Sequence, residues 1–122
     1  MDMKEEIKRW LKRSEEEFET AKIDFDAKKY FAAAFWCQQS VEKAFKALLI
    51  KKTNTFPKVH DLTYLAKLND SPKKILVICS KINPAYTASR YPDMISKYSR
   101  TECKQILEEC KEVLKWIKER IS

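Results

Sequence analysis

An all-α fold is predicted, with helices packed as a bundle around one central helix, and three observations predict it. The chain of 122 residues contains no glycine and only four prolines, so few turns that need a positive φ are available. Residues 30–52 are apolar around most of a helical circumference. Residues 2–27 and 99–121 each carry one apolar stripe at helical spacing. The length suits a single domain over residues 1–122.

The first helix is predicted from Asp2 to Ala27. Its apolar side chains recur every three or four residues, and the rest of the circumference is mostly charged, which is typical of an outer helix with one buried face. The stripe consists of Met3, Ile7, Trp10, Leu11, Ser14, Phe18, Ala21 and Phe25. Because residues 26–29 make a short connection, the first two helices should form an antiparallel hairpin.

The central helix, Tyr30 to Lys52, must be covered by other helices on several sides. Its wide apolar arc consists of Phe31, Ala33, Ala34, Phe35, Cys37, Val41, Ala44, Phe45, Leu48 and Leu49. Gln38 and Glu42 interrupt this arc one turn apart. A carboxylate in such a setting costs several kcal/mol unless it is paired, so Glu42 should have a partner. A polar strip of Gln39, Lys43 and Lys46 continues around one edge.

A break and a short helix should follow the central helix. Pro57 removes an amide donor and disfavours helical structure in the residue before it. The tripeptide at residues 60–62, His-Asp-Leu, then opens a short helix that ends near Leu68. Its aspartate lies in the first turn, where the helix dipole favours a negative charge.

Two prolines mark the next elements. Ser71 is expected to cap a helix over residues 73–82, with Pro72 at the first helical position. The Asn83-Pro84 pair either repeats this arrangement for a further turn or bends the same helix. Residues 89–99 are polar and contain another proline, so an ordered loop is expected there.

The last helix should begin after Ser99, which with Glu102 has the spacing of a capping box, and end near Ile121. Its stripe consists of Cys103, Ile106, Leu107, Cys110, Val113, Leu114, Ile117 and Ile121. Trp116 lies off this stripe, and Trp36 lies off that of the central helix. Both tryptophans are therefore expected to be exposed, where they would indicate an oligomer contact.

Metal sites, disulfides and membrane spans are not expected. The four cysteines never occur as C-x-x-C and the chain has one histidine, so zinc-ligand spacing is absent. Buried free thiols, which suit a reducing compartment, are the better interpretation. No apolar run approaches the roughly 20 residues that span a bilayer, and the first residues are too charged for a signal peptide. A cytoplasmic location is expected.

The formal charge of +7 is concentrated in the middle of the chain. Residues 29–98 carry 12 basic and 4 acidic side chains, whereas residues 1–28 carry 7 and 9. A basic excess of this kind suits an anionic ligand such as a nucleotide or RNA, but lysine-rich surfaces also serve solubility. Charge alone favours the second interpretation.

Several segments together resemble the HEPN domain, a helical domain named from higher eukaryotes and prokaryotes and proposed to bind nucleotides. Residues 30–35 read YFAAAF and run into QQSVEKAFKALL at residues 38–49. The tripeptide at residues 60–62 follows at the expected distance, and SRYPD at residues 89–93 precedes the last helix. The similarity spans nearly the whole chain.

The resemblance implies an up-and-down bundle of four or five helices that commonly forms a homodimer. HEPN proteins are often encoded beside a minimal nucleotidyltransferase, as toxin and antitoxin, and many are metal-independent ribonucleases. In those, a histidine follows an arginine by four to six residues, so that proton transfer and phosphate binding are combined. Here neither Arg90 nor Arg100 is followed by a histidine at that distance. The resemblance therefore favours a nucleotide- or RNA-binding protein without strong catalysis of its own.

The candidate ligand-binding residues are Gln38, Gln39, Glu42, Lys46, His60, Arg90 and Tyr91, and the candidates for catalysis are His60 and Arg90. Histidine is the side chain best suited to exchange protons near neutral pH, so His60 could transfer protons, or it could simply cap its helix. Arg90 and Tyr91 offer a phosphate fork and a stacking ring. Alternatively, Tyr91 and the following proline wedge the loop onto the bundle, while Arg90 pairs with Asp93 or Glu42.

The polar residues of the central helix also allow two interpretations. An interhelical network could use Gln38, Glu42 and Lys46 only to set helix register. Otherwise Glu42 orients Arg90 or His60, and the two glutamines meet a base or ribose edge. Two further functions follow from these alternatives: a divergent metal-independent endoribonuclease that uses His60 and Arg90, and a protein interaction module that uses the tryptophans. No cofactor is expected beyond a nucleotide ligand, and no metal.

Overall fold

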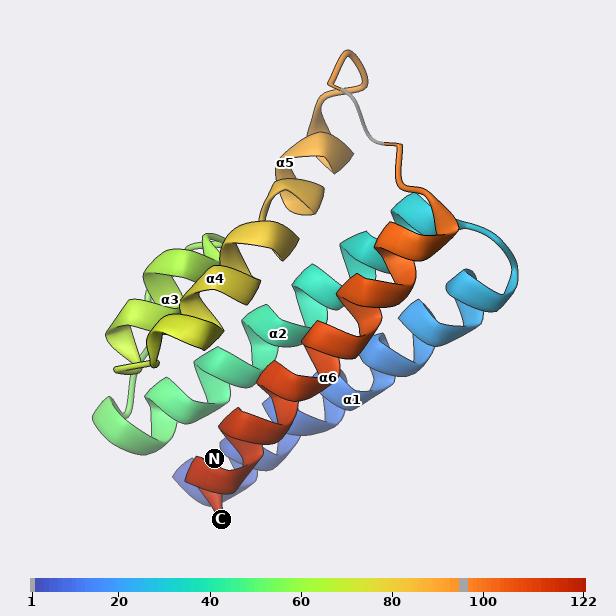
Figure 1. Ribbon diagram of the computed structural model, residues 1–122. Coiled ribbons are helices and arrows are strands. Elements are labelled where there is room, and N and C mark those ends of the chain that lie inside the picture. Colours follow the sequence, from blue (N-terminus) through green and yellow to red (C-terminus); the bar gives the residue numbers. More distant parts are fainter. Residues whose placement is uncertain (1, 95–96) are drawn as a thin grey trace.

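The computed structural model describes residues 2–94 and 97–122, and within these residues it contains helices and loops but no strand. Six helical segments follow one another along the chain (Figure 1). They are α1 (Met3–Asp26), α2 (Tyr30–Thr53), α3 (Leu62–Leu68), α4 (Lys73–Ile82), α5 (Pro84–Arg90) and α6 (Arg100–Ile121). The all-α prediction is confirmed, and the predicted helices match these bounds to within about two residues.

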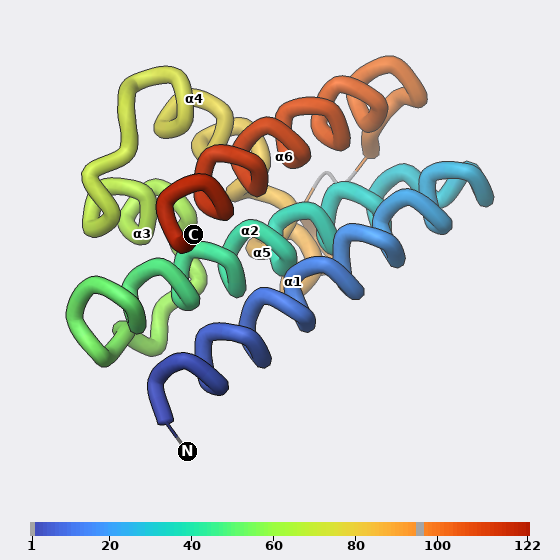
Figure 2. Tube along the Cα trace, turned by 90° about the horizontal axis from the view of Figure 1, so that it is seen from below, coloured from blue at the N-terminus to red at the C-terminus, as the bar shows by residue number. Residues whose placement is uncertain are grey.

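Three long helices form the body of the molecule. The α1 and α2 helices make the predicted antiparallel hairpin, and α6 runs alongside α2 in the same direction (Figure 1). Figure 2 shows α1 and α6 on different sides of α2, with α3 and α4 at its carboxyl-terminal half. The central position predicted for residues 30–52 is therefore correct, because α2 contacts all five other helices.

The helix starts follow the local sequence. Ser99 and Glu102 make the predicted capping box at α6, and the Asp61 carboxylate accepts from the backbone N–H of Thr63 (3.0 Å) at α3. The N-cap predicted for α4, Ser71, lies one residue before the observed N-cap. Pro72 itself takes the extended N-cap conformation (φ −70°, ψ 164°), and the helix begins at Lys73, so the Ser71 hydroxyl does not cap it.

The junction of α4 and α5 is a bend rather than a new capped helix. Asn83 has helical dihedral angles (φ −51°, ψ −43°), and the missing N–H of Pro84 interrupts the helix there. The side chain of Asn83 instead accepts from the backbone N–H of Leu62 (2.9 Å) and donates to the Asp61 carboxylate (2.9 Å). Counting α4 and α5 as one bent helix gives five helices over the described residues, and the side chain of Asn83 attaches this bend to the start of α3.

The uncovered part of α2 is a narrow stripe. After its first two residues, the only residues of α2 before Lys51 that are neither buried nor fully exposed are Ala32, Phe35, Trp36, Gln39 and Lys43. Their spacing of three or four residues places them on one face of the helix. We call these five residues the α2 stripe. Side chains of neighbouring helices cover the rest of the circumference.

The two tryptophans predicted to be exposed are half-buried and pack against the core. Trp36 makes an edge-to-face contact with Phe35, with ring centroids 5.2 Å apart. The guanidinium of Arg120 covers the ring of Trp116 at 3.9 Å from its centroid. The prediction was wrong because residues just outside an apolar stripe can still bury much of a large ring.

The hairpin of α1 and α2 is fixed by a buried pair of serines. The Ser14 hydroxyl donates to the carbonyl of Ser40 (2.7 Å), and the Ser40 hydroxyl donates to the carbonyl of Ser14 (2.7 Å). Both residues are fully buried. These small side chains let the two helices approach closely at this crossing, and the reciprocal hydrogen bonds set their register.

In residues 2–94 and 97–122, three non-glycine residues make left-handed turns. Lys28 (φ 63°), Asn54 (φ 60°) and Asp70 (φ 53°) end or follow α1, α2 and α3 respectively. Asparagine and aspartate tolerate this conformation better than other non-glycine residues, whereas lysine has no local compensation. The strain at Lys28 follows directly from the absence of glycine.

The four cysteines are buried and free, as predicted. The Cys110 thiol donates to the carbonyl of Cys37 across the α2–α6 interface (3.7 Å). Burial raises the pKa of Cys79 and of Cys103 to about 12. Both thiols are therefore neutral at physiological pH and poor nucleophiles. Over the described part of the chain, no helix combines the length and hydrophobicity that crossing a bilayer requires.

Candidate functional site

The buried carboxylate of Glu42 has two partners on different elements. Its Oε2 accepts from the ammonium of Lys46, one turn further along α2 (2.9 Å), and its Oε1 lies 3.0 Å from Nδ1 of His60. Glu42 and Lys46 are 4 % and 5 % exposed, whereas the His60 side chain is 47 % exposed. The pairing expected for this carboxylate is present, and it joins a buried cation to a half-exposed imidazole.

Two aromatic rings surround the ammonium of Lys46. It lies 5.9 Å from the ring centroid of Trp10 on α1 and 5.6 Å from that of Phe56 in the loop after α2. These rings contact each other edge to face at 4.8 Å. Aromatic faces stabilise a desolvated cation, so the rings and Glu42 together compensate for burial of this charge.

The backbone of His60 is held by the other polar residue of α2. The amide nitrogen of Gln38 donates to the carbonyl of His60 (2.8 Å), and its amide oxygen accepts from Gln39 (2.7 Å). Gln38 is fully buried. Two residues one turn apart on α2 thus fix this histidine, since Gln38 holds its main chain and Glu42 holds its ring.

The other side of the imidazole is covered by a residue that the sequence analysis did not single out. The ring of Tyr86, on α5, stacks on His60 with centroids 4.4 Å and planes 17° apart. The Arg90 guanidinium donates to the Tyr86 hydroxyl (2.7 Å) and lies 5.1 Å from the same ring. Tyr86 and Arg90 are one helical turn apart, and this spacing in a short helix was the available signal.

An open hollow of about 560 Å³ adjoins this stack at the end of α5. Its lining consists of Tyr86, Thr87, Arg90 and Tyr91. Tyr91 is 57 % exposed, so it does not wedge the loop onto the bundle. Among the described residues, Arg90 forms no ion pair with Asp93 or with Glu42, and its guanidinium remains available beside the hollow.

The structure brings the predicted site residues together in two groups. Glu42, Lys46 and His60 are in direct contact, whereas Arg90 reaches them only through the ring of Tyr86. Gln38 is buried behind His60, Gln39 lies on the α2 stripe, and Tyr91 is at the hollow. Tyr86, which the sequence did not single out, therefore links Arg90 to the group of Glu42, Lys46 and His60.

The arrangement has the groups needed to hold a phosphate and a base. An Arg90 guanidinium can pair with a phosphate, and tyrosine rings can stack on a base. A carboxylate next to Nδ1 favours the proton on that nitrogen, which leaves Nε2 of His60 as the nitrogen free to exchange a proton. In the described segments, no group of three or more His, Cys, Asp or Glu side chains could hold a metal ion.

Comparison with known proteins gives a consistent result. The HEPN domain family model matches residues 7–121. The crystal structure of ST0689, an archaeal HEPN homologue, superposes with a TM-score of 0.81 at 28 % identity, covering 95 % of this chain and 98 % of that one. TT1696 from Thermus thermophilus has the same fold, with a TM-score of 0.80 at 20 % identity over 93 % and 97 % of the two chains. Among curated proteins, no sequence matches.

Proposed function

The chain belongs to the HEPN domain family, and from this premise we propose that it binds a nucleotide or RNA at the site of His60, Tyr86 and Arg90. The observation that carries the proposal is the stack of these three side chains beside the open hollow at the end of α5. Arg90 would pair with a phosphate, and Tyr91 would stack on a base. In this proposal the protein has no strong catalysis of its own.

The buried residues of the site would act by positioning. Gln38, Glu42 and Lys46 are too deeply buried to touch a ligand in this conformation. Glu42 instead holds the imidazole of His60, Gln38 holds its main chain, and Lys46 pairs with Glu42. A pre-organised side chain loses less conformational entropy when it binds. Gln39 is partly exposed beside the site, so it remains accessible for a base or ribose edge.

The proposal extends to partners. Family membership supports a homodimer and a minimal nucleotidyltransferase as the second component of a toxin–antitoxin pair. Co-expression with a nucleotidyltransferase encoded beside this chain, followed by affinity purification, should recover both proteins in a fixed ratio. Recovery of this chain alone would contradict that part of the proposal.

Calorimetric titration with ATP, GTP and a short RNA tests the ligand. Saturable binding of at least one is expected, and Arg90→Ala should abolish it because the phosphate loses its cation. Arg90 is exposed, so this change should leave the fold intact. Arg100→Ala is the matched control, since Arg100 is exposed at the start of α6 and covers Phe25 rather than Tyr86. Absence of binding, or equal binding by the Arg90 variant, refutes the proposal.

A second candidate function, metal-independent RNA cleavage, is favoured by the contact between Glu42 and His60. A carboxylate that orients an imidazole is a usual arrangement for proton transfer, and Nε2 could serve the 2′-hydroxyl of RNA. This candidate predicts cleavage in the presence of EDTA and its loss in His60→Ala. If concentrated wild-type protein leaves RNA intact, the enzyme hypothesis fails and the binding proposal stands.

A further inference from the structure

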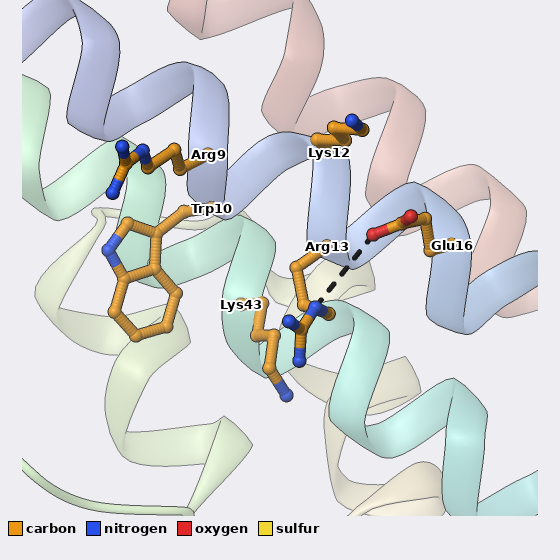
Figure 3. A pocket seen from close by; sticks show the side chains of 6 residues that line it. All are labelled: Arg9, Trp10, Lys12, Arg13, Glu16 and Lys43. Atoms are coloured by element: carbon orange, nitrogen blue, oxygen red, sulfur yellow. Dashed lines mark ion pairs between the residues drawn. The ribbon is translucent and has the colours of Figure 1, made fainter.

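A second hollow, lined by basic side chains, lies where α1 crosses α2 and shares Trp10 with the surroundings of Lys46. It has a volume of about 430 Å³, and Figure 3 shows its lining: Arg9, Trp10, Lys12, Arg13, Glu16 and Lys43. Four of these six side chains are cations and one is an indole. The side chains of Trp10, Arg13 and Lys43 point to the same side of α1, whereas Lys12 points away at the rim (Figure 3).

Three of the four cations of this hollow have no close anionic partner among the described residues. Arg13 contacts Glu16 at 3.8 Å with both side chains at least 60 % exposed, a geometry that contributes little. Arg9 and Lys12 have no ion pair within residues 2–94 and 97–122, and both are exposed. Only Lys43 has a close partner, Glu17 at 2.8 Å. Arg9 without an ion pair among the described residues, and Arg13 with only its long contact to Glu16, can therefore receive an anion.

The second hollow is connected to the first site through α2. Lys43 donates to Gln39 (3.4 Å), Gln39 donates to Gln38 (2.7 Å), and Gln38 donates to the carbonyl of His60 (2.8 Å). Lys43 and Gln39 are also neighbours on the α2 stripe, about 6 Å apart along the helix. Gln38 is buried, so the surface path between the hollows is formed by the partly exposed Gln39 and Lys43, and a ligand longer than one nucleotide would have to follow these two residues to contact both hollows.

We infer that the hollow at the α1–α2 crossing is a second phosphate-binding site, and that one strand of RNA occupies it together with the Arg90 site. This inference rests on the proposed function and specifies its ligand as an oligonucleotide. An indole among guanidinium groups suits a single strand, because unpaired bases stack on aromatic faces while the phosphates meet the cations. An acidic peptide would use the cations but would not need the indole.

Binding of a labelled single-stranded RNA of about twelve nucleotides, a length within the usual range of such sites, tests the inference. The variant is Arg9→Ala/Arg13→Ala, in which both changes are at exposed positions. We expect roughly tenfold weaker binding of the RNA, and a slope of log affinity against log salt that is smaller by about 1.4 for two lost phosphate contacts. Binding of ATP or GTP should not change.

The matched control is Lys8→Ala/Lys104→Ala, which removes the same charge from exposed positions outside the hollow. It should bind the RNA almost as well as the wild type. Equal affinity and equal salt slope for the Arg9/Arg13 variant would overturn the second site, and so would preferential binding of a polyglutamate peptide. If instead RNA binding requires Arg9 and Arg13 but no protein form binds ATP or GTP and Arg90→Ala is silent, the proposed function fails while the second site stands.

Discussion

The imidazole of His60 lies almost parallel to the ring of Tyr86, with centroids 4.4 Å apart and planes 17° apart. This contact joins two parts of the chain that approach the site from different helices. Glu42 and Gln38 position His60 from α2, and Arg90 is attached to Tyr86 within α5. A substitution that displaces His60 should therefore also displace Arg90 through this stack, and a substitution that displaces Tyr86 should also displace His60.

Substitutions of Tyr86 should distinguish what its stacking on His60 and its hydrogen bond with Arg90 each contribute to nucleotide binding. Tyr86→Phe keeps the ring over His60 but removes the acceptor of Arg90, so nucleotide binding should weaken by about 1 kcal/mol. Tyr86→Ala removes both contacts and should weaken binding further. Calorimetric titration measures both effects, with Tyr64→Phe, an exposed tyrosine on α3, as control. Wild-type affinity in the alanine variant would show that the stack has no part in binding.

Glu42→Gln should destabilise the fold as well as the site. The change leaves the ammonium of Lys46 buried without its anion, and breaking a buried pair in this way costs about 3–5 kcal/mol. Urea denaturation should show this loss in the free energy of unfolding. In the double variant Glu42→Gln/Lys46→Met, much of the loss should be recovered, because no charge remains buried. A double variant as unstable as the single one would contradict this explanation.

Trp36 and Trp116 should behave differently in assembly. Trp36 belongs to the α2 stripe, whereas the ring of Trp116 is covered by Arg120. The RNA is proposed to follow the polar part of the α2 stripe, Gln39 and Lys43, which leaves its apolar part, Ala32, Phe35 and Trp36, for a protein contact. If the proposed homodimer uses this apolar part, Trp36→Ala should convert it to a monomer, and Trp116→Ala should not. Light scattering after size exclusion measures the mass, and circular dichroism checks that each variant is folded. A dimer that persists in the Trp36 variant would place the interface elsewhere.

The buried thiols should make the protein less stable above about pH 9. The pKa of Cys79 is raised by burial from 9.0 to about 12, so at intermediate pH the thiol ionises in the unfolded chain but not in the folded one. Ionisation stabilises the unfolded state, and the free energy of unfolding should fall as pH rises, by up to about 1.4 kcal/mol for this cysteine near pH 10. Urea denaturation under reducing conditions near pH 8 and near pH 10 measures the change. Cys79→Ala should reduce the pH dependence, and an unchanged dependence would refute this origin.

The helices could be predicted because their signals are local. Periodic apolar residues gave α1, α2 and α6, and the need of Glu42 for a partner followed from its apolar neighbours. Tyr86 could not be selected in the same way, because its role depends on the bend at Asn83 that brings α5 to His60. A contact of this kind, between a loop residue and a helix of the folded chain, has no fixed spacing in sequence.

The second hollow could not be predicted from the summed charge of the first helix. Residues 1–28 are acidic in total, but residues 1–13 contain five basic and three acidic side chains, while residues 14–28 contain two and six. The basic half crosses α2 beside Lys43, where it forms the hollow. A charge count per helical turn would have indicated it, although the contribution of Lys43 could only come from the packing of the two helices.

The left-handed turn at Lys28 offers a direct route to a more heat-resistant protein. A lysine with a φ of 63° carries a steric cost of about 1 kcal/mol that glycine lacks. Glycine has more conformational freedom in the unfolded chain, which offsets part of the stability gained by removing this cost but not all of it. Lys28→Gly should therefore raise the melting temperature, and Asn54→Gly should raise it less, since asparagine already tolerates this geometry. The residue type that this chain never uses is the one that would improve its first turn.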